Sequence, residues 1–171
     1  SWDSYRRFIQ LFGKVVFGVD DKKFDNVLNA TKKKQKVKDD SKLNVKSLKK
    51  IVLEYKKICE KHTKRKFPDS PNEQLELAIE AVFKSWMGER AVVYRRQNKV
   101  TRDIANGTAV NVVTMVFGNM GNDCATGVVF TRNGHNGKKE LEGEYLTNAQ
   151  GEDVVAGVRT GKNIEMLKKE M

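Results

Sequence analysis

The stretch SPNEQLELAIEAVFKSWMGERAVVY, residues 70–94, contains the point at which the periodicity of the chain changes. Ser70, Pro71 and Glu73 combine a capping hydroxyl, a proline suited to the first helical position and a glutamate three residues on, which predicts a helix start. The apolar residues that follow have helical spacing and predict one buried face: Leu75, Ala78, Ile79, Val82, Phe83 and Trp86. After Gly88 the period shortens to two, and Ala91–Tyr94 is predicted to be a short strand.

Three more helices are predicted on the N-terminal side of this stretch. The first has an apolar face made of Trp2, Tyr5, Phe8, Ile9, Phe12 and Val16. A shorter second helix contains Phe24, Val27 and Leu28. The third, which we expect Asn44 to cap, repeats the same rhythm with Val45, Leu48, Ile51, Val52, Tyr55, Ile58 and Cys59. We interpret all four apolar stripes as parts of a hydrophobic core.

The C-terminal side is predicted to be a sheet. Its candidate strands are 109–117, which is rich in β-branched residues, 127–131, 141–146 and 153–159. The links 119–123 and 133–137 are rich in glycine and asparagine, which tolerate positive φ in tight turns. The sequence therefore predicts an α+β protein, with a helical part followed by a mostly antiparallel sheet.

The composition limits the class of protein. No apolar run approaches the ~20 residues of a membrane span, and no charged-then-apolar leader opens the chain. The two cysteines, Cys59 and Cys124, lie far apart and near no cluster with metal-ligand spacing, so we expect two free thiols, a cytoplasmic location and no metal site.

The net charge of +11 has two possible interpretations. Much of it lies in Lys32–Lys50, a stretch without arginine or aromatic residues. Proteins that bind single-stranded nucleic acid usually place aromatic residues among their positive charges, so a solvated helical face is favoured over nucleic-acid binding. The alternative is a basic, non-enzymatic module that binds nucleic acid or an acidic partner through Lys32–Lys50.

Common catalytic motifs are absent from the sequence. It contains no phosphate-binding GxxxxGK[ST] loop, no GxGxxG and no nucleophile elbow. We expect the two histidines, His62 and His135, to be surface residues. The segment GEYLTNAQGEDVVAGVRT, residues 143–160, places Glu144, Glu152 and Asp153 around a polar turn, which from the residues alone could be a charged hairpin loop.

Several long strings, in order, resemble the pyruvate, phosphate dikinase family. They are SWDSYRRFIQLF, FPDSPNEQLELAIEAVFKSW, RAVVYRR, GTAVNVVTMVFGNMG, TGVVFTRN and the segment of residues 143–160. The resemblance spans nearly the whole chain, and only the lysine-rich stretch is nondescript. The resemblance implies part of an ATP-grasp fold, in which ATP lies between two lobes. Residues 1–70 would be a helical insertion, residues 71–116 a helix with strands of one lobe and the hinge, and residues 117–171 part of the second lobe.

The resemblance also implies binding residues. The hinge strand would hold adenine through its main chain and an apolar wall at Val113, Thr114 and Met115. Glu152 and Asp153 match an acidic pair placed to meet the ribose or to orient phosphate-binding groups. Glu144 and Arg7 match positions near the same cleft. The alternative, that Glu144 and Arg7 only join subdomains through ion pairs, stays open.

Four positions depart from the family pattern. Val113 stands where the family usually has glutamine, which removes one side-chain hydrogen bond near the adenine. Cys124 and Ala125 stand where it has a serine-glycine pair, and Gly134 where it has proline. The change at Cys124 and Ala125 would alter a loop that covers the nucleotide. The change at Gly134 loosens a turn.

The resemblance implies a reaction that needs more than this chain. The parent enzyme would convert ATP, pyruvate and phosphate to AMP, phosphoenolpyruvate and diphosphate through a phosphohistidine on another domain. We expect the phosphate-gripping lysine and arginine to precede Ser1, and the Mg²⁺ ligands to follow Met171. The partners would be ATP and the phosphohistidine and pyruvate-binding domains of the same parent, which is expected to be a homodimer. The 171 residues alone are expected not to turn over. The helical part could also serve as a docking surface for the phosphohistidine domain.

Overall fold

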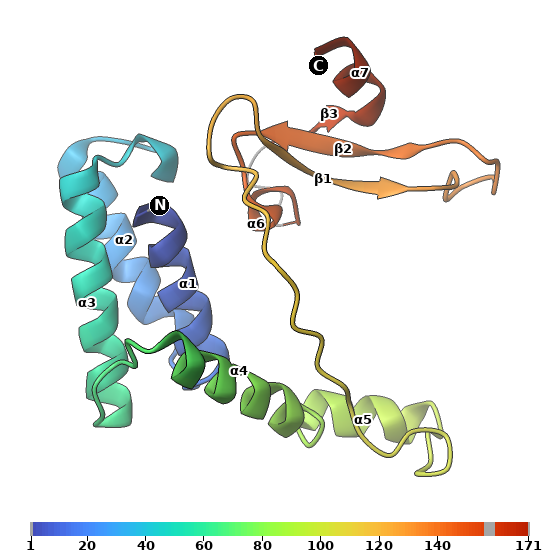
Figure 1. Cartoon of the computed structure of the whole chain (residues 1–171), viewed down its shortest axis with the longest axis horizontal. Helices are drawn as coiled ribbons and strands as arrows, with labels where there is room; N and C mark the ends of the chain where they lie inside the picture. The colour runs from blue at the N-terminus through green and yellow to red at the C-terminus, as the bar shows by residue number, and fades with distance from the viewer. Residues whose placement is uncertain (1, 156–159, 171) are drawn as a thin grey trace. The chain divides into compact units, whose positions relative to one another are not determined.

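The computed structural model describes residues 2–155 and 160–170, without the side chains of residues 41, 168 and 170. Its contacts divide the chain into two units, residues 1–112 and 113–171 (Figure 1). The first unit contains α1 (Trp2–Val15), α2 (Asp21–Gln35), η1 (Asp40–Lys42), α3 (Val45–Thr63), α4 (Pro71–Ser85) and α5 (Glu89–Gln97). The second contains β1 (Ala125–Phe130), β2 (Glu142–Thr147), α6 (Gly151–Val155), β3 (Lys162–Asn163), η2 (Ile164–Met166) and α7 (Leu167–Glu170).

Helices α1, α2 and α3 form a bundle with one continuous core, which confirms the first three predicted helices. Phe24, Tyr55 and Cys59 have no exposed surface, and the Tyr55 hydroxyl donates a hydrogen bond of 3.1 Å to the carbonyl oxygen of Phe24. Gly13 lies in the tightest part, where a Cβ would stand 2.7 Å from the Phe24 ring and 2.8 Å from the Cys59 sulfur. Because each fully buried large apolar side chain contributes about 1.5–3 kcal/mol, this core dominates the stability of the unit.

The ends of these helices follow from local chemistry. The Asn44 side chain accepts a hydrogen bond from the Ser47 amide, so the predicted cap of α3 is confirmed. Asp20 caps α2 by accepting from the Lys22 amide. Arg6 is a buried charge in the bundle, only 3% exposed, and its guanidinium pairs with Asp3 at 2.7 Å and Asp40 at 3.4 Å. Pairing is what makes a buried charge tolerable.

The predicted buried face of the fourth helix is wrong. Helix α4 begins at Pro71 as expected, but Ser70 makes no side-chain capping hydrogen bond. In the part of the chain that is described, α4 has no buried residue: Leu75 is 42% exposed and Phe83 53%. Ala78 of the predicted face does pack against the bundle core, together with Leu77, which was not predicted. Helical periodicity identified the helix, but which side of it is covered depends on the neighbouring elements.

The predicted strand at Ala91–Tyr94 is also wrong, because these residues lie inside α5. A run of four apolar residues does not distinguish a strand from a helix by its period. The flanking charges favour a helix, since Glu89 lies in the first turn and Arg95 and Arg96 in the last, where they complement the helix dipole.

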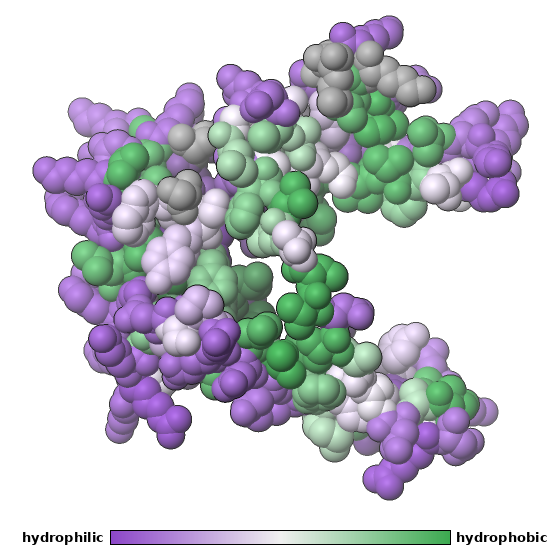
Figure 2. All heavy atoms as spheres, viewed as in Figure 1, coloured by the Kyte–Doolittle hydropathy of each residue, from purple (hydrophilic) through white to green (hydrophobic). Residues whose placement is uncertain are grey.

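The predicted long strand 109–117, which includes the hinge strand, has no helix or strand structure. Its apolar side chains are exposed, Val113 by 81% and Val116 by 90%, and Figure 2 shows the segment as a run of hydrophobic residues on the surface. β-Branched residues favour strands mainly through packing on a sheet. Nothing in the described chain supplies that packing here, so propensity alone does not produce a strand.

The second unit is built on a three-stranded antiparallel sheet in the order β1-β2-β3. This confirms the α+β class and two of the predicted strands, with β1 opposite β2 from Ala125↔Thr147 to Phe130↔Glu142. Their hairpin uses the predicted turn: the Gly137 amide donates to the Asn133 carbonyl at 2.9 Å, and Gly137 has a φ of 71°. The short strand β3 was not predicted.

The predicted strand at 153–159 is wrong over residues 153–155. Residues 151–155 form α6, and residues 156–159 lie outside the described part of the chain. Helix α6 places Val154 against Leu146 and Ala149 in a small core cluster.

Both cysteines are free thiols, Cys59 buried and Cys124 half-buried, as expected. Across the described residues, none of the helices has the length and apolar character needed to cross a membrane.

Candidate functional site

The predicted acidic residues of the second unit lie within β2 and at the start of α6. Glu144 is an exposed residue of β2, opposite Val128 of β1 and Asn163 of β3. Gly161 lies so close to the Glu144 side chain that a Cβ there would overlap it. Glu144 therefore stands in the middle of a sheet, on backbone that is paired on both sides, rather than on a free loop.

Alternation along β2 determines which residues accompany Glu144. Successive side chains of a strand point to opposite faces, so Glu144 and Leu146 share one face and Tyr145 lies on the other. Leu146 contacts Val154 of α6, which places α6 over the face that carries Glu144. On the opposite face, Tyr145 is buried and the Lys162 ammonium lies 6.0 Å from its ring centroid. Glu144 and the start of α6 thus belong to the same side of the sheet.

Asp153 has a structural role in this turn. Its carboxylate accepts a hydrogen bond of 2.9 Å from the Gln150 amide, and its own amide donates 2.9 Å to the Gln150 carbonyl. This reciprocal pair resembles a capping box and fixes the start of α6. Glu152, the preceding residue, is exposed in the first turn of the same helix. Asp153 thereby holds the backbone from which Glu152 projects.

The polar turn is anchored to the loop that follows the predicted hinge. The Ala149 amide donates 3.0 Å to the Gly118 carbonyl, and the Asn148 amide donates 2.8 Å to the Cys124 carbonyl. Gly118 has no room for a side chain, because a Cβ would lie 2.5 Å from the Ala149 oxygen and 2.6 Å from the Ala125 oxygen. These hydrogen bonds therefore join loop 118–124 to the turn and first α6 residues at 148–153, which we call the acidic turn.

These anchoring residues were missed by the sequence reasoning. Gln150 also reaches across the joint, since its side-chain amide lies 3.4 Å from the Asn119 side-chain oxygen. The signal was present as two Gly/Asn-rich strings, GNMGN at 118–122 and TNAQG at 147–151, but nothing in the sequence says that they meet. Asn148 takes a positive φ of 48°, a conformation that asparagine tolerates well.

The predicted hinge residues precede this joint directly. Val113, Thr114 and Met115 are all exposed, Met115 by 67%. Their main chain is not used in any sheet ladder described for the second unit, so its N–H and C=O groups are open to other partners. The joint at Gly118 fixes the C-terminal end of this segment beside the acidic turn, and the roles of the three residues in adenine binding stay predictions.

Arg7 lies in the first unit, on α1. Its Nε atom is 3.0 Å from a carboxylate oxygen of Asp3 on the same helix, and its side chain is mostly buried. The structure thus gives Arg7 a local ion pair, and its predicted place near the nucleotide is not tested by it.

Two further pockets lie away from the predicted residues. In the second unit, a pocket of about 950 Å³ is lined by the β1–β2 hairpin and η2, including Glu140, Glu142 and Glu165. In the first, a pocket of about 1050 Å³ surrounds α5, where the Arg95 guanidinium lies 3.9 Å from the centre of the Trp86 ring. Neither lining includes a residue predicted to bind nucleotide. Among the residues described, three or more His, Cys, Asp or Glu side chains nowhere form a group that could hold a metal ion.

Comparison with known proteins adds the family context. The family model described as "Pyruvate phosphate dikinase, AMP/ATP-binding domain" matches residues 17–171. The chain is 52% identical over 99% of its length to a pyruvate, phosphate dikinase of Entamoeba histolytica and 52% identical over 98% to one of Giardia intestinalis. It is 48% identical over its whole length to the chloroplastic pyruvate, phosphate dikinase 1 of Arabidopsis thaliana. The chain spans 18–19% of the length of these relatives.

Proposed function

We propose that this chain, which belongs to the pyruvate phosphate dikinase family through its AMP/ATP-binding domain, forms the adenine and ribose side of an ATP site. The observation that carries the proposal is the hydrogen-bonded joint between loop 118–124 and the turn at 148–150. It fixes the end of the predicted hinge beside the turn that leads into α6 and its exposed Glu152. Glu144 is exposed on the same face of the sheet. The hinge segment and the carboxylates would both be needed to bind one nucleoside.

The chemistry of the parts suits the two halves of a nucleoside. The unpaired main chain of Val113–Met115 supplies N–H and C=O groups for an adenine edge, and Met115 supplies an apolar surface for its ring. Carboxylates are strong hydrogen-bond acceptors, so Glu144 and Glu152 suit ribose hydroxyls. Asp153 acts through the backbone, because its capping hydrogen bond sets the direction of the first turn of α6.

The reaction belongs to the parent protein. There, a phosphoryl group of ATP would pass to a histidine on another domain and from there to pyruvate, with phosphate taking up the second phosphoryl group. The products are AMP, phosphoenolpyruvate and diphosphate. An ATP-grasp arrangement of two lobes, a homodimeric parent and a cytoplasmic location belong to the same proposal. Among the described residues, no group of three or more His, Cys, Asp or Glu side chains could hold Mg²⁺.

A chimeric enzyme tests the proposal. Residues 1–171 would replace the matching segment of the Entamoeba histolytica dikinase, and phosphoenolpyruvate formation from ATP, pyruvate and phosphate would be measured. The chimera should be active, and Glu152→Gln should raise the KM for ATP about tenfold, because hydrogen bonds to charged groups contribute about 1.5–3 kcal/mol. Glu144→Gln should act in the same direction, and neither change should alter the KM for pyruvate.

The matched control is Glu165→Gln, which neutralises an exposed glutamate of the same unit outside the turn. Its KM for ATP should equal that of the unmodified chimera. Unchanged ATP affinity in both Glu144→Gln and Glu152→Gln would remove these carboxylates from the site. A folded but inactive chimera would contradict the functional equivalence of the segment itself.

A further inference from the structure

The positive charge of the chain is concentrated in its helical bundle. Residues 1–70 contain 20 Lys and Arg against 9 Asp and Glu, whereas residues 71–171 contain 13 of each. The whole net charge of +11 therefore lies in residues 1–70. The bundle also has its own buried core, so these charges sit on a framework of fixed helices. In Figure 2 the side of α2 and α3 that is in view is covered mostly by hydrophilic residues.

A groove between α2 and α3 is lined by several of these positively charged side chains. It has a volume of about 520 Å³ and is lined by Lys23 and Asn26 from α2 and by Ile58, Lys61 and His62 from α3. Ile58 is half-buried, and the other four side chains are exposed. The lining has two ammonium groups, an amide and an imidazole, and it has no carboxylate. Four hydrogen-bond donors from two facing helices thus surround one apolar floor.

The acidic residues on the neighbouring turns are engaged elsewhere. Asp20 caps α2, and Asp21 bonds Gln10 and Lys14 of the α1 side, hydrogen bonds that lower the pKa of the Asp21 carboxyl. On α3, Glu54 pairs with Lys57 at 2.9 Å, and Glu60 accepts a hydrogen bond from the Phe67 amide at 3.3 Å. The two groove lysines, by contrast, form no ion pair within the described part of the chain.

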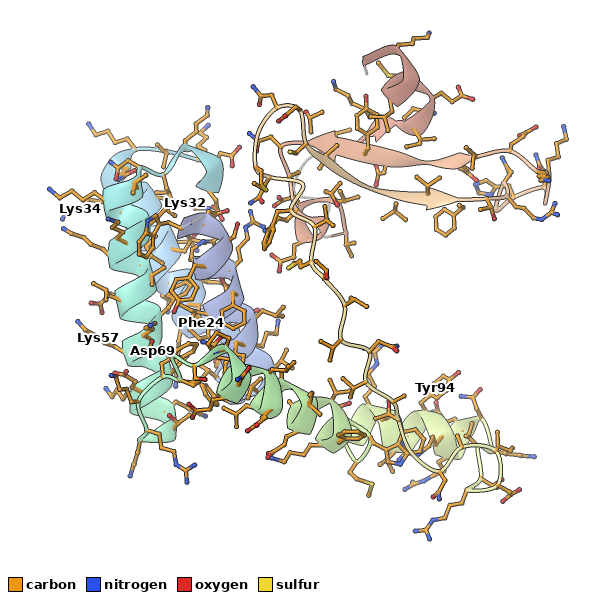
Figure 3. All side chains as sticks on the ribbon, in the orientation of Figure 1. Phe24, Lys32, Lys34, Lys57, Asp69 and Tyr94 are labelled. Carbon is orange, nitrogen blue, oxygen red and sulfur yellow. The ribbon has the colours of Figure 1, made fainter. Side chains whose placement is uncertain are left out.

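Other lysines of α2 and α3 also lie on the outside of the bundle. Figure 3 shows Lys34 of α2 and Lys57 of α3 pointing away from the bundle, while Phe24 points into it. The helix ends act in opposite directions at the groove, because the start of α2 favours an anion and the end of α3 disfavours one. Lys61 and His62 in the last turn of α3 offset that second effect.

We propose that the α2–α3 groove, defined by Lys23, Asn26, Lys61 and His62, binds a small multivalent oxyanion of the phosphate class. Two ammonium groups on facing helices can bridge an anion that carries two or more charges, and the amide and imidazole N–H groups donate to its oxygens. The groove has no aromatic side chain on which a nucleobase could stack, so the phosphate part of a ligand is recognised rather than a base. This site is independent of the nucleotide site proposed above.

Titration of the 171-residue chain with inorganic pyrophosphate tests the proposal. Binding would be followed by calorimetry and by amide NMR shifts at low ionic strength, where exposed charges interact most strongly. The double variant Lys23→Gln/Lys61→Gln should weaken pyrophosphate binding at least tenfold. Because both side chains are exposed, the variant should fold normally, and its thermal unfolding would be recorded as a check.

The matched control is Lys22→Gln/Lys46→Gln, which removes the same charge from exposed positions of the same two helices outside the groove. It should change the affinity less than twofold. Equal losses in the two double variants would overturn the groove and indicate attraction to the overall charge. Stronger binding of a DNA duplex than of pyrophosphate, with equal sensitivity to both double variants, would replace the proposal by a nucleic-acid surface. An absence of pyrophosphate binding at millimolar concentrations would also overturn it.

Discussion

The bundle formed by α1–α3 and the sheet unit of residues 113–171 are stabilised in different ways. Among the described residues, the bundle buries twelve side chains in one core cluster, whereas the cluster of the sheet unit contains three. The sheet unit depends instead on backbone hydrogen bonds and on glycines that allow close approach, as at Gly118 and Gly143. Side-chain volume thus holds the first region, and backbone geometry holds the second.

The largest expected effect is on the bundle core. Phe24→Ala should lower the free energy of unfolding of the bundle by about 3–5 kcal/mol, because it removes a fully buried ring and leaves a cavity. Denaturant unfolding followed by helical circular dichroism measures this change. Phe83→Ala, at a site that is 53% exposed on α4, is the control and should cost less than about 1 kcal/mol. Similar losses in both variants would contradict the description of the bundle as the core of the first unit.

Alkaline pH should lower the stability of the bundle through its buried thiol. Burial raises the pKa of the Cys59 thiol from 9.0 to about 11, so the folded bundle keeps a proton that the unfolded chain releases. The resulting stability is fully present below pH 9 and is lost as the pH rises to about 11. The loss is at most about 2.7 kcal/mol, at 1.36 kcal/mol per pKa unit.

Unfolding midpoints measured from pH 8 to 11.5 would check this expectation. In Cys59→Ala the loss of stability over this range should be smaller by the same amount, whatever the lower absolute stability of that variant. Tyr55 should make the stability of both proteins fall further at higher pH, because burial raises the pKa of its hydroxyl to about 12. Identical pH profiles for the two proteins would show that the thiol is not shielded in the way its burial implies.

A smaller effect is expected at the joint in the sheet unit. Gly118→Ala should destabilise this unit by about 2 kcal/mol, because its Cβ would stand within 2.6 Å of two backbone carbonyl oxygens. Amide hydrogen exchange at Ala149 and Asn148 should accelerate, while exchange in the bundle should stay the same. Gly151→Ala is the control, since a Cβ there meets nothing within 4 Å. Unchanged exchange in Gly118→Ala would mean that the joint does not hold the acidic turn.

The comparison of the two regions also explains which sequence predictions succeeded. Helices α1, α2 and α3 were predicted because their apolar residues follow one period and face one another, so local pattern and tertiary packing agree. Segment 109–117 has an equally clear β-branched pattern, but it is not a strand, because a strand needs partners that its own sequence does not contain. Residues 91–94 failed for a related reason, since the charges outside the apolar run favour a helix.

The candidate site was only partly accessible from the sequence. Family resemblance indicated Glu144, Glu152 and Asp153, and these residues lie on neighbouring elements of one unit. Their different environments were not predictable: Asp153 caps α6, whereas Glu144 and Glu152 are exposed. The roles of Val113, Thr114, Met115 and Arg7 in nucleotide binding stay predictions.

The sequence by itself determined the α+β class, the three bundle helices, the β1–β2 hairpin and the family. It also indicated most of the bundle core, although Trp2, Phe8 and Val45 of the predicted faces are exposed. Each of these depends on residues close in the chain, through period, caps and turn glycines, or on long strings shared with relatives. The tertiary structure alone decided that loop 118–124 meets the turn at 148–150, that Leu77 of α4 packs against the bundle, and that Lys23 and Lys61 line one groove. The physical reason is that these contacts join residues about 24 to 38 positions apart, or depend on which neighbour covers a helix. Such pairings are not specified by local periodicity.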